Sequence, residues 1–217
     1  MGALFGLVVL VGSFWGMQGV IVAGVFAVFM NVGAWYFSDR IAIATMRGQE
    51  VTAETAPQLY HMVERLAQRA NLPMPRVYVC PHQAPNAFAT GRSPSHAAVA
   101  VTQGALQLLN ERELEGVMAH ELAHVKNRDT LTSTIAATVA GLFSMLAYMS
   151  LFFGGSRGGG NPLAALGMVL LGAIGAALIK AMISRSREFV ADADGAAIAG
   201  TPDGLVSALR KLEDSSR

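Results

Sequence analysis

Long runs without charge alternate along this chain with segments whose apolar residues follow helix or strand periods. Residues 1–38 hold no charged side chain, and one helix of that length would measure about 57 Å against a hydrocarbon core of ~30 Å. They are therefore predicted to form two transmembrane helices, roughly 2–16 and 19–37, that reverse near "GMQG". A signal peptide is disfavoured because neither a charged start nor a small-residue cleavage site is evident. Since the first span is short, either it is tilted in a thinned bilayer or the natural chain begins slightly upstream.

Two further apolar runs, 130–153 without charge and 162–183 with Lys180 near its end as the one charged residue, are long enough to span a bilayer and rich in the small residues that let helices approach closely in lipid. They are predicted to form a transmembrane hairpin over 130–183 around the turn "GGSRGGGN"; buried globular helices are the alternative. Basic residues follow the second and fourth spans and precede the third: Arg40, Arg47, Lys126, Arg128, Lys180, Arg185 and Arg187. The positive-inside rule then places residues 39–129 and 184–217 on the cytoplasmic side of the membrane, in a multi-pass protein.

The stretch between the two pairs of spans is predicted to be α+β. In "TAPQLYHMVERLAQRANL" one helical face carries apolar residues, namely Leu59, Met62, Val63, Leu66 and Ala70. Short strands are expected at "RVYVC" and, within "NAFATGRSPSHAAVAV", at 86–90 and 97–101, joined by a Gly/Ser/Pro turn. Asn110 with Glu113 three residues later is typical of a capping box, so a helix is expected to begin there.

Composition agrees with a small soluble domain attached to membrane helices, because 53% of residues are hydrophobic and only 14% are charged. The net charge of +1 gives no reason to expect a nucleic-acid partner. Cys80 is the single cysteine, which excludes an internal disulfide. Its apolar neighbours indicate a small buried residue rather than a ligand or a nucleophile.

The helix expected after Asn110 contains "HELAH", residues 120–124. His120 and His124 differ by about 40° around a helix, with Glu121 on the same side. The opposite flank is apolar, with Leu114, Met118, Leu122 and Val125. This arrangement predicts a Zn²⁺ site in which both histidines coordinate and Glu121 stays free to take a proton from water. A solvated helix face is the alternative, and the remaining histidines, His61, His82 and His96, are interpreted as surface residues.

A catalytic zinc ion needs a third protein ligand, and three segments contain candidates. Asp129 follows His124 by five residues, which is about 140° around a continuous helix. Asp203 lies in "TPDG", which faintly resembles the aspartate signature of intramembrane site-two proteases, although their zinc helix lies within a hydrophobic span. Glu188 and Asp192, in "SRSREFVADADGA", are one helical turn apart, so one can coordinate while the other orients a histidine.

Taken together, "NAFATG", "HELAH", "NRDT" and "SRSREFVADADG" resemble the HtpX family of membrane zinc metallopeptidases, relatives of the CaaX prenyl protease. The resemblance covers nearly the whole chain. It implies an α-helical membrane protein of about four transmembrane helices with an α+β, gluzincin-like zinc metalloprotease domain. It also implies zinc ligands His120, His124 and Glu188, Glu121 as general base, and cleavage of misfolded or damaged membrane proteins on the cytoplasmic side. Members run some tens of residues further, so the chain is expected to be a fragment.

Chain order favours Glu188 as the third ligand, because a two-helix hairpin returns the chain to the side of the membrane that it left. Asp192 is then predicted to accept the ring N–H of His120 or His124. The alternatives are Asp192 as ligand with Glu188 outside, or Asp203 or Asp129. An edge strand at Asn86, Ala87, Phe88 and Ala89 is predicted to pair with a polypeptide substrate, the alternative being a core hairpin. The rival functions are an intramembrane protease and a non-catalytic membrane scaffold that keeps zinc structurally.

Overall fold

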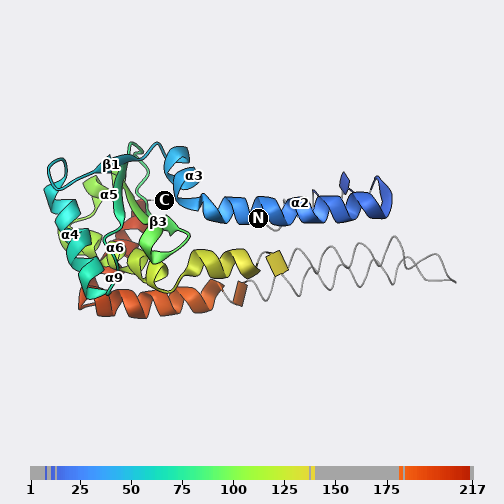
Figure 1. Ribbon diagram of the computed structural model, residues 1–217. Helices are drawn as coiled ribbons and strands as arrows, with labels where there is room; N and C mark the ends of the chain where they lie inside the picture. Colours follow the sequence, from blue (N-terminus) through green and yellow to red (C-terminus); the bar gives the residue numbers. More distant parts are fainter. Residues whose placement is uncertain are drawn as a thin grey trace. The chain divides into compact units, whose positions relative to one another are not determined.

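The computed structural model describes residues 8, 11–12, 14–136, 138–139, 181–182 and 184–215. The chain divides into two compact units, residues 1–34 with 132–185 and residues 35–131 with 186–217 (Figure 1). The functional domain boundaries expected from sequence, at 38, 129 and 183, stay a prediction. The predicted span 2–16 and the hairpin of 130–153 and 162–183 fall mostly outside the described residues.

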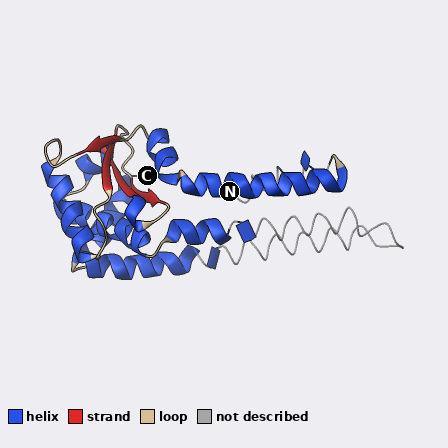
Figure 2. Cartoon of the chain, in the orientation of Figure 1, coloured by secondary structure: helices blue, strands red, loops and turns tan. Residues whose placement is uncertain are grey.

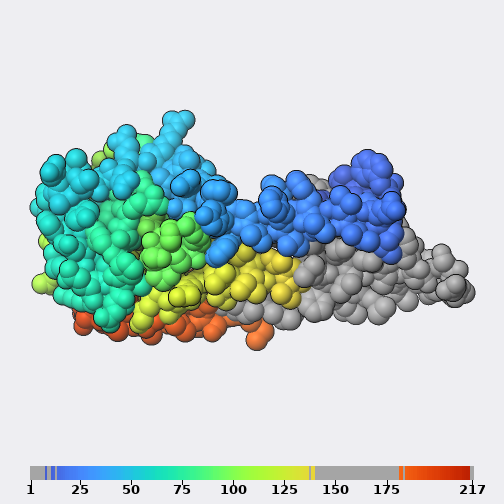
Figure 3. Space-filling model, in the orientation of Figure 1, coloured from blue at the N-terminus to red at the C-terminus, as the bar shows by residue number. Residues whose placement is uncertain are grey.

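The first unit is described mainly by helix α2, Gly16–Tyr36. Among the described residues it is the one helix long and apolar enough to cross a bilayer, by length and composition. Its 21 residues extend about 32 Å, close to a ~30 Å hydrocarbon core. The helix belongs to the blue part of the surface in Figure 3. Several of its large apolar side chains are exposed, including Val22, Val25, Phe26 and Phe29. Exposed apolar patches of this size mark surfaces that contact lipid or another protein.

The turn before α2 comes earlier than the sequence predicted. Residues 14–15 form the turn, and α2 already begins at Gly16, whose φ of 72° favours glycine. Just before the turn, the backbone of Gly12 lies so close to Gly19 that a side chain at either position would clash. The reversal predicted near "GMQG" therefore lies directly before that motif, and Gly19 within it serves a close backbone contact with Gly12.

The second unit is built on one mixed four-stranded sheet of order β1-β2-β4-β3. Its strands are red in Figure 2. Strand β2 (Arg76–Cys80) lies parallel to β4 (Ala97–Thr102), while β3 (Ala87–Gly91) is antiparallel to β4. All three were expected from sequence to within about a residue. The edge strand β1 (Gln49–Val51), antiparallel to β2, has only three residues and gave no periodic signal.

Each face of the sheet has its own apolar cluster. The larger core lies under helices α4 (Pro57–Arg69), α6 (Glu111–Lys126) and α9 (Asp203–Ser215). The smaller one lies under α3 (Ser38–Thr45) and comprises Ile43, Tyr78, Cys80, Ala98 and Ala100, with Phe88 packed against it. Cys80 is fully buried, as predicted, and burial raises the pKa of its thiol.

Helix α6 begins at the predicted capping box. The Asn110 side chain accepts the Glu113 backbone N–H, and the Glu113 carboxylate accepts the Asn110 N–H. Glu113 also accepts hydrogen bonds from Ser207 (2.6 Å) and Lys211 (2.7 Å) of α9, and these contacts lower its pKa to about 2. Gly116 of α6 and Gly204 at the start of α9 allow the two backbones to touch there. The short helix α5 (Gln103–Leu108) precedes this junction.

Candidate metal centre and active site

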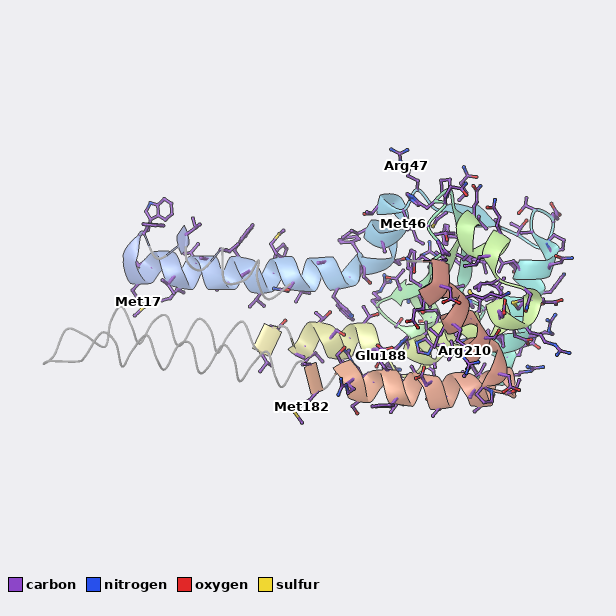
Figure 4. The ribbon with its side chains drawn as sticks, turned by 180° about the vertical axis from the view of Figure 1, so that it is seen from behind. Met17, Met46, Arg47, Met182, Glu188 and Arg210 are labelled. Atoms are coloured by element: carbon purple, nitrogen blue, oxygen red, sulfur yellow. The ribbon has the colours of Figure 1, made fainter. Side chains whose placement is uncertain are left out.

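Three side chains from two helices converge in the second unit. His120 and His124 lie on α6, and Glu188, labelled in Figure 4, lies on the helix of residues 184–199. The Nε2 atoms of the two histidines are 3.2 Å apart. Glu188 Oε2 lies 3.6 Å from each of these nitrogens. The sequence-predicted donor residues therefore share one small volume.

The spacing of these three atoms fits a tetrahedral zinc ion. Zinc–ligand bonds of about 2.0–2.1 Å at tetrahedral angles separate neighbouring ligand atoms by about 3.3 Å. The observed separations, 3.2 to 3.6 Å, are close to that value. The histidines are largely buried, whereas the Glu188 side chain is 57% exposed. One side of the triangle is thus open to solvent, as a site with a vacant fourth position for water or substrate requires.

Each imidazole has a carboxylate behind its second nitrogen. Asp192 Oδ1 lies 2.9 Å from Nδ1 of His120, although the pair is not aligned as a hydrogen bond. Asp129 Oδ2 lies 2.6 Å from Nδ1 of His124 and does form one. The structure brings together His120 and the predicted partner Asp192. Asp129 lies behind His124, on the side of Nδ1 and away from the two Nε2 atoms. The helical wheel had instead placed it about 140° away from His124.

The misplacement of Asp129 on the helical wheel has a local cause. The calculation of 140° assumed a continuous helix, but α6 ends at Lys126 and Arg128 has a φ of 54°. A left-handed residue turns the chain back, and Asp129 then returns to the side of His124. The asparagine that follows the last helical residue was the signal available in the sequence, since Asn is common at helix ends.

Glu121 lies beside the donor triangle and contacts the sheet. Its Oε2 accepts a 2.9 Å hydrogen bond from the backbone N–H of Ala89 in β3. Burial raises the pKa of this carboxyl, while the Ala89 N–H and the two histidines act in the opposite direction. The carboxylate is held next to the imidazoles but outside the triangle of ligand atoms, a position suited to moving a proton. Sequence periodicity gave no indication of this contact with β3.

The helix of residues 184–199 is placed against α6 by contacts along its length. Near its start, Arg187 donates to the Asp129 carbonyl (3.0 Å). In its middle, Asp194 accepts hydrogen bonds from Asn127 (2.9 Å) and Lys126 (3.3 Å), which lower its pKa. The next residue, Gly195, lies so close that an added Cβ would be 2.9 Å from the His120 Cα. These contacts fix the distance between Glu188 and the two histidines.

A cavity of about 300 Å³ adjoins the donor triangle. Its polar end is formed by His120, Glu121, Glu188 and Asp192. Much of the remaining lining is apolar and comes from α6 and α9, with Val117, Leu205, Leu209 and Leu212. Asn86 and Ala87, at the start of β3, also line it. The polar centre therefore opens into an apolar recess beside the edge strand.

The other candidates from the sequence lie outside the triangle. His61 is exposed and pairs with Glu64, and the ring of His96 contacts the hydroxyls of Ser93 and Ser95. Asp203 is the first residue of α9. Within the part of the chain that the structure describes, the one group of three or more His, Cys, Asp or Glu side chains placed to share a metal ion is His120, His124 and Glu188.

Comparison with known proteins gives consistent relatives. Residues 53–214 match Peptidase family M48. The chain is 52% identical to "Protease HtpX homolog" of Trichormus variabilis, with 100% of this chain and 78% of that protein covered. It is 54% identical to the protein of the same description from Burkholderia multivorans, covering 97% and 74%. The corresponding protein of Desulforapulum autotrophicum is 49% identical, covering 100% and 73%.

The fold resembles a solved structure as well. The crystal structure of S. mikatae Ste24p superposes with a TM-score of 0.64 at 18% identity. The match covers 99% of this chain and 55% of that one, so the chain spans about half the length of that protein. At this identity the likeness concerns the fold, whereas the sequence relatives carry the family assignment.

Proposed function

This chain belongs to peptidase family M48 and is a membrane-bound metallopeptidase, and we propose that it is a zinc endopeptidase of the cell inner membrane. Its zinc ion is held by His120, His124 and Glu188. Its substrates are unfolded or damaged membrane proteins, cleaved on the cytoplasmic side. The observation that carries the proposal is the triangle of donor atoms with separations of 3.2 to 3.6 Å, beside a carboxylate that is not part of it.

The chemistry assigned to the protein's own residues centres on Glu121. A zinc ion at this site supplies Lewis-acid activation of a water molecule and of the scissile carbonyl. Glu121 would take a proton from the attacking water molecule and would later pass it to the leaving amine. Burial favours this role because it raises the pKa of the carboxyl and so makes it a better base. The Ala89 N–H keeps the carboxylate turned toward the sheet edge, where a peptide bond can lie.

The edge strand β3 is proposed to bind the substrate backbone. It is the last strand of the sheet, and it pairs with β4 on one side. The Asn86 carbonyl accepts from Thr102, whereas the Ala89 N–H points the other way, to Glu121. Because backbone direction alternates along an antiparallel strand, Phe88 bonds toward β4 and the groups of Ala87 and Ala89 point outward. An extended peptide added there runs directly past the metal centre.

A structural zinc site in a non-catalytic scaffold is the rival, and it usually has four protein ligands. The first experiment uses the whole chain purified in detergent with an unfolded protein such as casein. Cleavage should stop on adding a chelator and return with zinc. Glu121→Gln should keep its zinc and lose roughly 10²–10⁴-fold in kcat. The control Glu115→Gln, on the same helix but beside Arg69, should cleave normally. Zinc-loaded wild-type protein without cleavage would favour the scaffold.

The strand-pairing proposal has its own test. Ala87→Pro removes one outward N–H at an edge position where proline is tolerated, so KM should rise with the fold intact. Ala87→Ser keeps the N–H and should behave as wild type. If Ala87→Pro unfolds the domain, β3 belongs to an ordinary core hairpin, and the strand-pairing proposal is excluded. An unchanged KM in a folded protein would equally contradict it.

The intramembrane alternative differs in where the site lies. Lys126→Cys places a thiol at the end of α6, and the native Cys80 is buried. A membrane-impermeant thiol reagent should label it in inverted membrane vesicles and not in intact spheroplasts. If the thiol is labelled in neither preparation but becomes labelled once detergent is added, the site lies within the bilayer instead.

A further inference from the structure

Asp129 is held at the metal centre by contacts that the proposed function has not yet used. Its carboxylate hydrogen-bonds to Nδ1 of His124 at 2.6 Å, and both side chains are mostly buried, 14% and 21% exposed. A metal-binding histidine is neutral, and in a neutral ring beside a carboxylate, which only accepts hydrogen bonds, the proton lies on Nδ1. The lone pair is then on Nε2, which is the nitrogen that faces His120 and Glu188.

The backbone of Asp129 is also held in place, by a turn and by a hydrogen bond. The turn at Arg128, with a φ of 54°, directs Asp129 toward His124. The Asp129 carbonyl accepts a 3.0 Å hydrogen bond from Arg187, the residue before Glu188. One residue thus contacts a histidine of α6 through its side chain and the helix of the acidic donor through its backbone.

We propose that Asp129 is a positioning residue for the metal centre, which fixes the tautomer and ring orientation of His124 and links its helix to the helix of Glu188. The proposal rests on the proposed function, because it takes His124 and Glu188 as metal ligands. It assigns one carboxylate to each imidazole, Asp192 to His120 and Asp129 to His124. Only the Asp129 contact is aligned as a hydrogen bond. Removing the Asp129 carboxylate is therefore expected to weaken zinc binding at least as much as removing the Asp192 carboxylate.

The same geometry argues against Asp129 as a metal ligand. Its carboxylate approaches His124 from the Nδ1 side, whereas the three donor atoms gather on the Nε2 side. The lone-pair directions of the two ring nitrogens diverge, so a metal ion bound to Nε2 is out of reach of an oxygen 2.6 Å from Nδ1. Residues behind metal-bound histidines typically change metal affinity by about 10–100-fold when removed.

The test measures zinc affinity by chelator competition with the whole purified chain, independently of cleavage. Asp129→Ala should weaken zinc binding by about 10–100-fold, and Asp129→Asn, which keeps the shape and an acceptor oxygen, should weaken it less. The visible absorption of the cobalt(II)-loaded protein should change in Asp129→Ala, because the ring of His124 is released. Asp203→Ala, which removes a carboxylate at the start of α9, is the control and should change neither readout.

A second pair of variants separates the position of Asp129 from its charge. Arg128→Gly and Arg128→Val both remove the arginine side chain, but only glycine adopts a φ of 54° without strain. Arg128→Gly should therefore keep more of the wild-type zinc affinity than Arg128→Val, because the two variants differ only in whether the backbone at this position is strained. This pair remains informative if Asp129→Ala fails to fold.

The outcomes are distinct from those that test the proposed function. Wild-type protein that binds zinc but does not cleave casein contradicts the proposed function and leaves Asp129 open to test by affinity. Asp129→Ala with wild-type affinity and an unchanged cobalt spectrum overturns the present inference. So does a wild-type chain that binds no zinc, since Asp129 then has no metal ligand to position.

Discussion

Helix α6 and the helix of residues 184–199 supply the two halves of the metal centre in different ways. The first begins at a capping box, buries an apolar flank and carries its two histidines mostly buried. The second exposes Glu188 and Asp192 by about half, and its flank against α6 is made of small residues such as Ala191 and Gly195. The position of α6 thus follows from local sequence signals and core packing, whereas the position of the helix of residues 184–199 depends on its contacts with other elements.

This difference predicts how each half of the metal centre responds to substitutions. Changes on α6 act on a helix that local signals and the core hold in place, so they should affect chemistry without moving the helix. The second helix depends on specific contacts, among them Asp194 with Asn127 and Gly195 with the His120 backbone. Loss of one of these should move Glu188 relative to the histidines, and metal affinity should report that movement before stability does.

Removing the acidic donor itself should have the largest effect. Glu188→Ala leaves two histidines, too few for a catalytic zinc site, so zinc content should fall sharply. Asp192→Ala removes only the carboxylate behind His120 and should weaken affinity by about 10–100-fold. Metal analysis of the purified variants measures both. If Glu188→Ala keeps a normal zinc content and Asp192→Ala loses zinc, then Asp192 is the ligand and Glu188 the supporting carboxylate. If both variants keep a normal zinc content, the third ligand lies elsewhere.

The sequence predicted more of the first helix than of the second. The start of α6 and the joint direction of His120 and His124 follow from capping and from a period of 3.6 residues, which are local properties. The strands β2, β3 and β4 were predicted for the same kind of reason. Asp129 was misplaced because its position depends on a left-handed turn after the helix ends. The Ala89 contact with Glu121 depends on tertiary packing, which residue periodicity does not encode.

Gly195→Ala should have the next largest effect and tests the second helix directly. An added Cβ would lie 2.9 and 3.0 Å from backbone atoms of His120, which have little freedom to retreat. Overpacking costs about 1–3 kcal/mol, against a gain of about 1 kcal/mol in helix propensity. The helix should shift, and zinc affinity should fall more than the unfolding free energy. Ala193→Gly, on the exposed side of the same helix, is the control and should cost stability without changing zinc affinity.

The junction of α6 with α9 should respond to pH. Hydrogen bonds from Lys211 and Ser207 hold the pKa of Glu113 at about 2, below its ordinary value of 4.5. A depressed carboxyl pKa stabilises the fold above about pH 4.5, and that contribution is lost as the pH falls toward 2. Glu113→Gln should therefore be less stable at neutral pH and should depend less on pH between 2 and 4.5. Denaturant titrations across this range measure it, and a wild-type profile in Glu113→Gln would exclude the mechanism.

The smallest effect is expected at the far end of the second helix, where Arg69 of α4 caps it. The guanidinium Nη1 lies 3.4 and 3.3 Å from the carbonyls of Ile198 and Ala199, and 3.5 Å from Glu115. Since the Arg69 side chain is 50% exposed, solvent weakens these contacts, and Arg69→Met should cost about 0.5–1 kcal/mol of unfolding free energy. The cap lies about three helical turns from Glu188, beyond the Gly195 contact, so zinc affinity should change less than threefold. Denaturation and zinc titration of one preparation measure both. A loss of zinc affinity as large as that in Gly195→Ala would show that the helix moves as a rigid rod about Gly195, and that its C-terminal cap positions Glu188 as well.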